Sequence, residues 1–106
     1  MLRIDKDPAF RTVVTVKLPG EEQESFRARF RVLGLAEQET FELGSAEGAT
    51  GFLRRVLFDG EDIAGADNQP LVWSDELRDR LIDLPHIRSA LVRAYFEGVA
   101  SAREGN

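Results

Sequence analysis

The chain has 106 residues, of which 42% are hydrophobic, and its 14 basic and 19 acidic side chains give a formal net charge of −5. This length and apolar content suit one ordinary domain and exclude a disordered chain. The absence of cysteine excludes disulfides, thiolate metal sites and cysteine nucleophiles. No apolar run approaches the roughly 20 residues of a membrane-spanning helix, and the acidic N-terminal stretch lacks the features of a signal peptide. We expect a soluble cytoplasmic protein that does not contact a membrane.

The charges are unevenly distributed along the chain. The net charge is +2 over residues 1–33, −6 over residues 34–70 and −1 over residues 71–106. The overall acidity argues against nucleic-acid binding, because that affinity derives mostly from neutralisation of phosphates by Lys and Arg. The basic start and the acidic middle either attract each other within the fold or present two faces to different partners.

The first third of the chain has the pattern of a β-hairpin. Residues 10–18, FRTVVTVKL, alternate with the period of a strand, and their β-branched side chains suit a pleated sheet. Pro19-Gly20 interrupts this pattern, which returns over residues 25–33, SFRARFRVL. We therefore predict an antiparallel hairpin over about 10–18 and 25–33, with one apolar face that helices from the rest of the chain must cover.

The second predicted strand carries a row of arginines, Arg27, Arg29 and Arg31, on its polar face. Such a row is either a solvated face that protects a sheet edge from aggregation or a docking strip for an acidic partner segment. The second interpretation rests on the bidentate pairs that Arg forms with carboxylates.

The remainder of the chain has helical features. We predict three to four helices, over about 36–43, 46–58, 75–84 and 86–102, with an acidic loop over 59–70. Ser74 is suited to cap the third helix, and Pro85 is suited to the first position of the fourth. The predicted fold is a single α+β domain: a hairpin part over 1–34, a helical part over 35–102 and a flexible tail over 103–106.

The last predicted helix has a wider apolar arc than packing on one neighbour requires. The main apolar stripe consists of Ile87, Ala90, Leu91, Ala94 and Tyr95. Val92, Phe96 and Val99 form a second apolar stripe beside it. Either the helix is central, between the hairpin and the preceding helices, or this second stripe is offered to a partner. The same arc also indicates a homo-oligomer.

Three motifs resemble chemical sites only in part. GSAEGATG, residues 44–51, lacks the Lys of a phosphate loop, and the acidic loop lacks the ligand spacing of an EF-hand. Nothing near His86 makes it a base, and nothing indicates a dry pocket around Asp59 and Asp62. We expect no catalytic residue, no cofactor and no metal site. A ligand-binding module or enzyme that uses the acidic loop stays as an alternative.

The second half of the chain contains three family-like stretches: QPLVWSDEL over residues 69–77, LIDLPHIRSAL over 81–91, and Ala94-Tyr95. With their surroundings, residues 52–99, they are similar to the tail assembly chaperones of long-tailed bacteriophages. FRARFRVL, at the second strand, also resembles a strand of that family. Trp73 stands where the family more often has Phe.

The resemblance implies a non-enzymatic binding protein of the host cytoplasm. Such a chaperone holds the tape-measure protein soluble, helps recruit tail-tube subunits and is not retained in the virion. We assign this contact to Arg27, Arg29, Arg31, Val92, Phe96 and Val99. The alternative function is a small structural tail or connector subunit of the virion.

Overall fold

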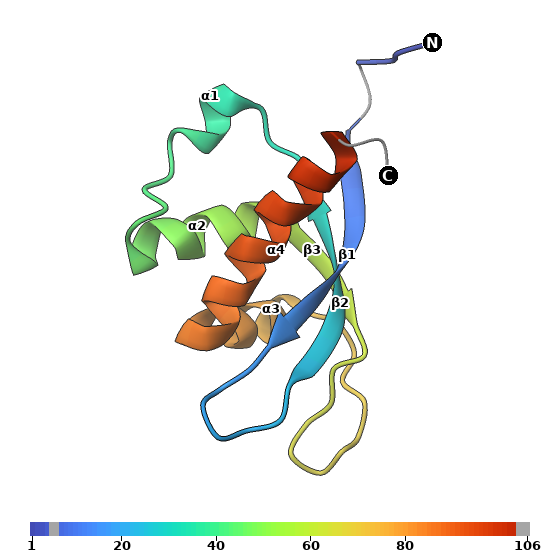
Figure 1. The fold of residues 1–106 in the computed structure, drawn as a ribbon, viewed down its shortest axis with the longest axis vertical. Coiled ribbons are helices and arrows are strands. Elements are labelled where there is room, and N and C mark those ends of the chain that lie inside the picture. The colour runs from blue at the N-terminus through green and yellow to red at the C-terminus, as the bar shows by residue number, and fades with distance from the viewer. Residues whose placement is uncertain (5–6, 104–106) are drawn as a thin grey trace.

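The described helices gather on one side of an antiparallel sheet (Figure 1). The computed structural model describes residues 1–4 and 7–103. In chain order the elements are β1 (Ala9–Val16), β2 (Glu24–Arg31), α1 (Leu35–Gln38), α2 (Ala46–Val56), β3 (Leu57–Glu61), α3 (Asp75–Asp83) and α4 (Pro85–Arg103). The strand order is β1-β2-β3, so β2 is central. The predicted α+β fold, with an N-terminal hairpin followed by helices, is confirmed.

β1 and β2 form the predicted hairpin, and all eight residues of each strand are paired. Each strand ends two residues before its predicted end. The loop opens with a tight turn in which the Glu21 N–H donates to the Leu18 carbonyl at 3.0 Å. Pro19 sets the first corner of this turn, and Gly20 takes a φ of +81° at the second, a conformation that glycine adopts without strain.

β3 lies where the sequence predicted the end of a helix and a structureless loop. The helix predicted over 46–58 ends at Val56, and the next five residues pair with β2. Leu57 is extended, with φ −84° and ψ 110°, and its side chain is 1% exposed. The helical prediction was wrong here because Leu57 lies opposite Phe30 in the sheet and enters the core, which a short apolar run cannot reveal.

The helices differ in how well the sequence predicted them. α1 is four residues long, so the prediction over 36–43 was wrong in its second half, where Phe41 turns inward and packs edge-on against Phe52. α3 and α4 lie within one residue of their predicted bounds. The Ser74 hydroxyl accepts from the Leu77 N–H at 3.0 Å, and α4 begins at Pro85, as predicted.

α4 reaches Arg103, and the rest of the predicted tail, 104–106, lies outside the described residues. Over the described part of the chain, no helix combines the length and the apolar character needed to cross a membrane.

The core lies between the sheet and the helices, and α4 is its central element. α4 packs against β1, α2 and α3 (Figure 1). Its Tyr95 is 1% exposed, and its ring lies 5.6 Å from that of Phe30 and 4.9 Å from that of Phe52. The Tyr95 hydroxyl accepts a hydrogen bond of 3.1 Å from the buried Leu33 N–H. The main apolar stripe of α4 is therefore core.

Tyr95→Phe tests this hydrogen bond. We expect the free energy of unfolding to fall by about 1–3 kcal/mol, because the buried Leu33 N–H loses its acceptor while the ring packing is retained. Urea unfolding measures the change. Ser89→Ala, which removes an exposed hydroxyl from the same helix, should change stability by less than about 0.5 kcal/mol. Equal effects of the two substitutions would contradict the role of the Tyr95 hydroxyl as the acceptor for the Leu33 N–H.

Gly98→Ala and Gly51→Ala form a matched pair. Helix propensity alone favours Ala at both positions by roughly 1 kcal/mol. A Cβ at Gly98 would overlap the ring of Phe10, whereas a Cβ at Gly51 would lie 3.4 Å from the ring of Phe41. We expect Gly98→Ala to destabilise the domain by about 1–3 kcal/mol through overpacking and Gly51→Ala to leave it equally or more stable. Thermal unfolding of both variants tests this predicted difference in stability. Stabilisation by Gly98→Ala would contradict the close packing of α4 on β1.

Candidate functional site

The sheet has one covered and one uncovered face within the described structure. Alternate residues of β1 and β2, including Val14, Ala28 and Phe30, point toward the helices and are buried. The residues between them point to the opposite side. We call that side the open face; it consists of Arg11, Val13, Thr15, Arg27, Arg29, Arg31, Phe58, Asp59 and Glu61.

A β-bulge in β3 shapes the open face. Phe30 lies opposite Leu57 and Arg29 lies opposite Asp59, so Phe58 is an extra residue between the two pairs. The bulge thereby brings Phe58 and Asp59 to the same side of the sheet. An aromatic ring is added to the arginine row in this way.

The ring of Phe58 supports two of the arginines. The guanidinium carbon of Arg31 lies 4.4 Å from the ring centroid, and that of Arg29 lies 5.1 Å from it. Cation–π contacts of this kind stabilise by about 0.5–1 kcal/mol at exposed sites. These contacts restrict where the two guanidinium groups lie on the open face.

Carboxylates lie at the two ends of the arginine row. Arg27 has Asp62 at 3.7 Å and Glu61 at 3.9 Å, and Arg31 has Asp7 at 3.8 Å. The pairs are long and the Arg27 side chain is 57% exposed, so each contributes at most about 1 kcal/mol. The row therefore has weak internal counter-charges at its margins.

The centre of the open face is different. Arg11 and Arg29 lie directly opposite each other on β1 and β2. Like charges in such cross-strand positions repel. Among the described residues, neither has a carboxylate at ion-pair distance. Asp59, opposite Arg29 on the other side, accepts instead from the Gly60 N–H at 2.9 Å. At the centre the exposed Arg11 and the half-buried Arg29 thus have no ion-pair partner from this part of the chain.

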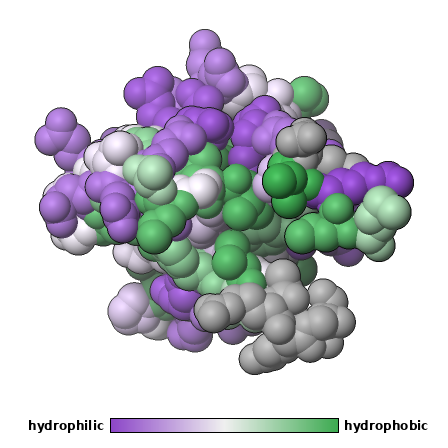
Figure 2. Space-filling model, turned by 90° about the horizontal axis from the view of Figure 1, so that it is seen from above, coloured by the Kyte–Doolittle hydropathy of each residue, from purple (hydrophilic) through white to green (hydrophobic). Residues whose placement is uncertain are grey.

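The α4 residues predicted to bind a partner lie on the other side of the sheet. Val92, Phe96 and Val99 are half-buried and pack against the core. The Phe96 ring stacks on Phe52, with centroids 5.9 Å apart and an interplanar angle of 6°. Figure 2 shows apolar side chains reaching the surface at the end of the molecule where α4 terminates. The structure does not bring these residues together with the arginine row, because the sheet separates the two sets.

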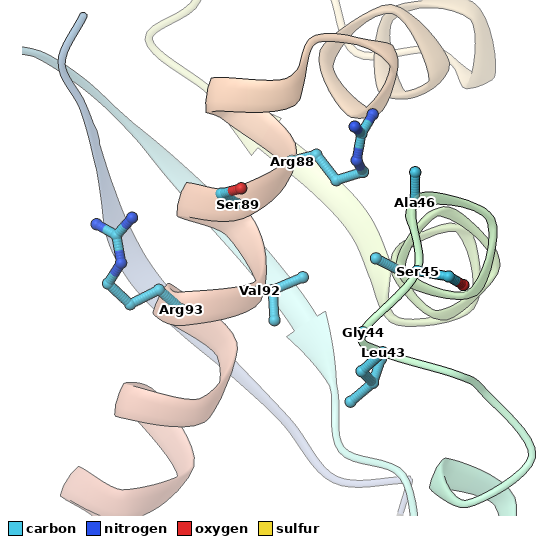
Figure 3. Close-up of a pocket in the computed structure, with 9 residues that line it drawn as sticks. Leu43, Gly44, Ser45, Ala46, Arg88, Ser89, Val92 and Arg93 are labelled. Atoms are coloured by element: carbon cyan, nitrogen blue, oxygen red, sulfur yellow. The ribbon is translucent and has the colours of Figure 1, made fainter.

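A groove of about 470 Å³ separates α4 from the segment that leads into α2 (Figure 3). Arg93 points away from this groove, and Arg88 points toward the end of α3. The Arg88 Nη1 donates to the Ile82 carbonyl at 3.0 Å, and the Ser45 hydroxyl accepts from the Gly48 N–H at 3.0 Å. The glycine-rich segment is therefore the capped start of α2, and Arg88 stabilises the end of α3.

The residues considered above as possible catalytic or metal-binding groups lie at separate places in the fold. His86 lies in the first turn of α4 and is half-buried. Asp59 and Asp62 are in β3 and in the turn that follows it. Over residues 1–4 and 7–103, no three His, Asp or Glu side chains group in the manner of metal ligands.

Comparison of the chain with models of protein families, with curated proteins and with solved structures finds no match. The candidate site is therefore identified by the geometry of the open face alone. Sequence reasoning assigned Arg27, Arg29 and Arg31 of the open face to a site and did not include Arg11, Val13 or Phe58. Pairing the predicted strands end to end would place Arg11 opposite Val32, so the observed register, with Arg11 opposite Arg29, was needed to find it. Phe58 gave no signal either, because its segment was assigned to a helix.

A double-mutant cycle with Phe58→Leu and Arg31→Gln tests the cation–π contact. Leu keeps an apolar side chain but lacks the aromatic quadrupole, so we expect a coupling free energy of about 0.5–1 kcal/mol in urea unfolding. The matched cycle with Phe58→Leu and Arg54→Gln should give no coupling, because Arg54 lies on α2 and pairs with Asp79 at 3.3 Å. Absence of coupling in the first cycle would contradict the stacked arrangement.

Proposed function

We propose that this chain is a tail assembly chaperone of a long-tailed bacteriophage. In this proposal it binds the tape-measure protein in the host cytoplasm, helps recruit tail-tube subunits and leaves before the virion is complete. It acts by binding, without catalysis or a cofactor. The observation that carries the proposal is the resemblance of residues 52–99 to that family.

The structure gives the family-like stretches physical roles that support the proposal. Ser74 caps α3, and Pro85 begins α4. Trp73 packs over Gly60, where a Cβ would lie 2.8 Å from its ring, so this aromatic residue fixes the segment before α3 against β3. Tyr95 is the centre of the core. The motif therefore describes the packing of the helical layer on the sheet, which is what sets the two candidate surfaces.

Those two surfaces suit different parts of a long helical partner. Val92, Phe96 and Val99 offer partly exposed apolar area, which fits the apolar face of a partner helix. Arg27, Arg29 and Arg31 offer cationic donors to acidic side chains on the other side of the sheet. Self-association through the apolar surface belongs to the same proposal.

Co-expression with the tape-measure protein of the same phage tests the proposal. We expect more tape-measure protein in the soluble fraction and recovery of a complex of the two chains. Val99→Ser and Arg29→Glu should each reduce the recovered complex by roughly tenfold, which corresponds to about 1.4 kcal/mol. Arg80→Glu, on the exposed side of α3, is the matched charge control and should leave recovery unchanged.

Mass spectrometry of purified particles separates the proposal from its alternative. A chaperone is absent from finished tails, whereas a structural tail or connector subunit is present at a fixed ratio to the tube protein. A fixed ratio would overturn the proposed function, and so would failure of the chain to form a complex with the tape-measure protein.

A further inference from the structure

We infer that the open face binds an extended acidic segment of a partner polypeptide, whose carboxylates contact Arg11 and Arg29. Apolar side chains of the same segment contact Val13 and Phe58. The inference rests on the proposed function only for the identity of the partner. The binding chemistry itself follows from the residues of the open face.

The two positive charges at the centre of this face favour a carboxylate as the ligand group. Arg11 and Arg29 repel each other across the β1–β2 pair, and a carboxylate between them would replace that repulsion with two charge-assisted hydrogen bonds. Asp7, Glu61 and Asp62 occupy the margins, and Asp59 lies opposite Arg29 on β3 without reaching ion-pair distance from it. Marginal carboxylates disfavour a uniformly anionic ligand such as nucleic acid, and they favour a segment whose negative charge is concentrated at its middle.

The spacing of the arginines along β2 favours an extended segment as the ligand. The arginines of β2 recur at every second residue, which places successive Cβ atoms on this face roughly 6.6 Å apart. Alternate residues of an extended peptide repeat with the same period, so a segment that runs along β2 can meet the row in register. Its remaining side chains would point away from the sheet.

The apolar members of the open face favour a polypeptide over a small anion. Val13 is 57% exposed, and Phe58 is half-buried beside the guanidinium groups of Arg29 and Arg31. Both lie among the arginines, where they can contact aliphatic side chains of a bound segment. The contact of Arg29 with Phe58 also reduces the conformational freedom that binding would otherwise remove.

Fluorescence anisotropy tests the inference with a labelled Val-Ser-Glu-Ser-Glu-Ser-Val peptide (the Glu-Val peptide), whose central Glu side chains and flanking Val side chains share one side when it is extended. We expect the wild-type chain to bind this peptide and not the counterpart in which Gln replaces Glu. The double variant Arg11→Gln/Arg29→Gln should bind at least about tenfold more weakly, because charge-assisted hydrogen bonds are lost. Arg54→Gln/Arg80→Gln removes the same charge from the helical layer and should bind as the wild type does.

A charge swap controls for damage to the fold. Arg29→Glu should lose the Glu-Val peptide and gain affinity for its counterpart in which Lys replaces Glu, which an unfolded variant would not do. The inference is overturned if the wild type does not bind the Glu-Val peptide, or if both double variants weaken binding equally. It is also overturned if a single-stranded oligonucleotide binds as tightly and responds to the same substitutions.

Sedimentation velocity addresses the remaining occupant, a second copy of this chain. A dimer that dissociates in Arg11→Gln/Arg29→Gln would show that the chain itself covers the open face, and would overturn the inference.

The peptide assay contains no tape-measure protein. Its result therefore separates failure of this inference from failure of the proposed function, which the co-expression assay reports.

Discussion

Tyr95 connects the two layers of this domain by two different interactions. Its ring lies between Phe30 of the central strand and Phe52 of α2, so it contributes apolar contact to both layers. Its hydroxyl accepts the N–H of Leu33, two residues after β2 ends. Because that N–H is buried, it needs an acceptor inside the protein, and α4 must lie where it can supply one. This requirement helps to position α4 across the sheet, where the helix also packs against β1, α2 and α3.

The open face is a direct consequence of how the core is covered. In a strand, the alternation that directs Val14 and Ala28 to the helices directs their neighbours to the other side. Helices on one side therefore leave a polar side, and in this chain arginines dominate it. β3 modifies the surface, because its bulge brings the Phe58 ring to the arginines. The core pattern thus determines where the candidate site is, and one extra residue in an edge strand determines its chemistry.

Local rules explain which elements could be predicted. The hairpin follows from strict alternation, and the bounds of α3 and α4 follow from Ser74 and Pro85, each of which acts on its own turn. β3 could not be predicted, because it is short and is stabilised by pairing with residues distant in the sequence. The arginine row was evident from one strand alone. The pairing of Arg11 with Arg29 needed the register of two strands, and the role of Phe58 needed a strand that local pattern does not indicate.

The uneven charge of the chain acquires a structural explanation. Two interpretations were open: attraction between the basic start and the acidic middle, or separate faces for different partners. Glu61 and Asp62 approach Arg27, so the acidic middle does reach the basic strand, but at 3.9 and 3.7 Å and with exposed side chains. Pairs of this kind exchange at small cost, because solvent already weakens them. A partner's carboxylates can therefore compete for Arg27 at the margin, and at the centre no described carboxylate lies at ion-pair distance from Arg11 or Arg29, although Asp59 lies opposite Arg29. The attraction between the basic start and the acidic middle is therefore present, weak and confined to the margin, and contact of the centre with a partner belongs to the proposal.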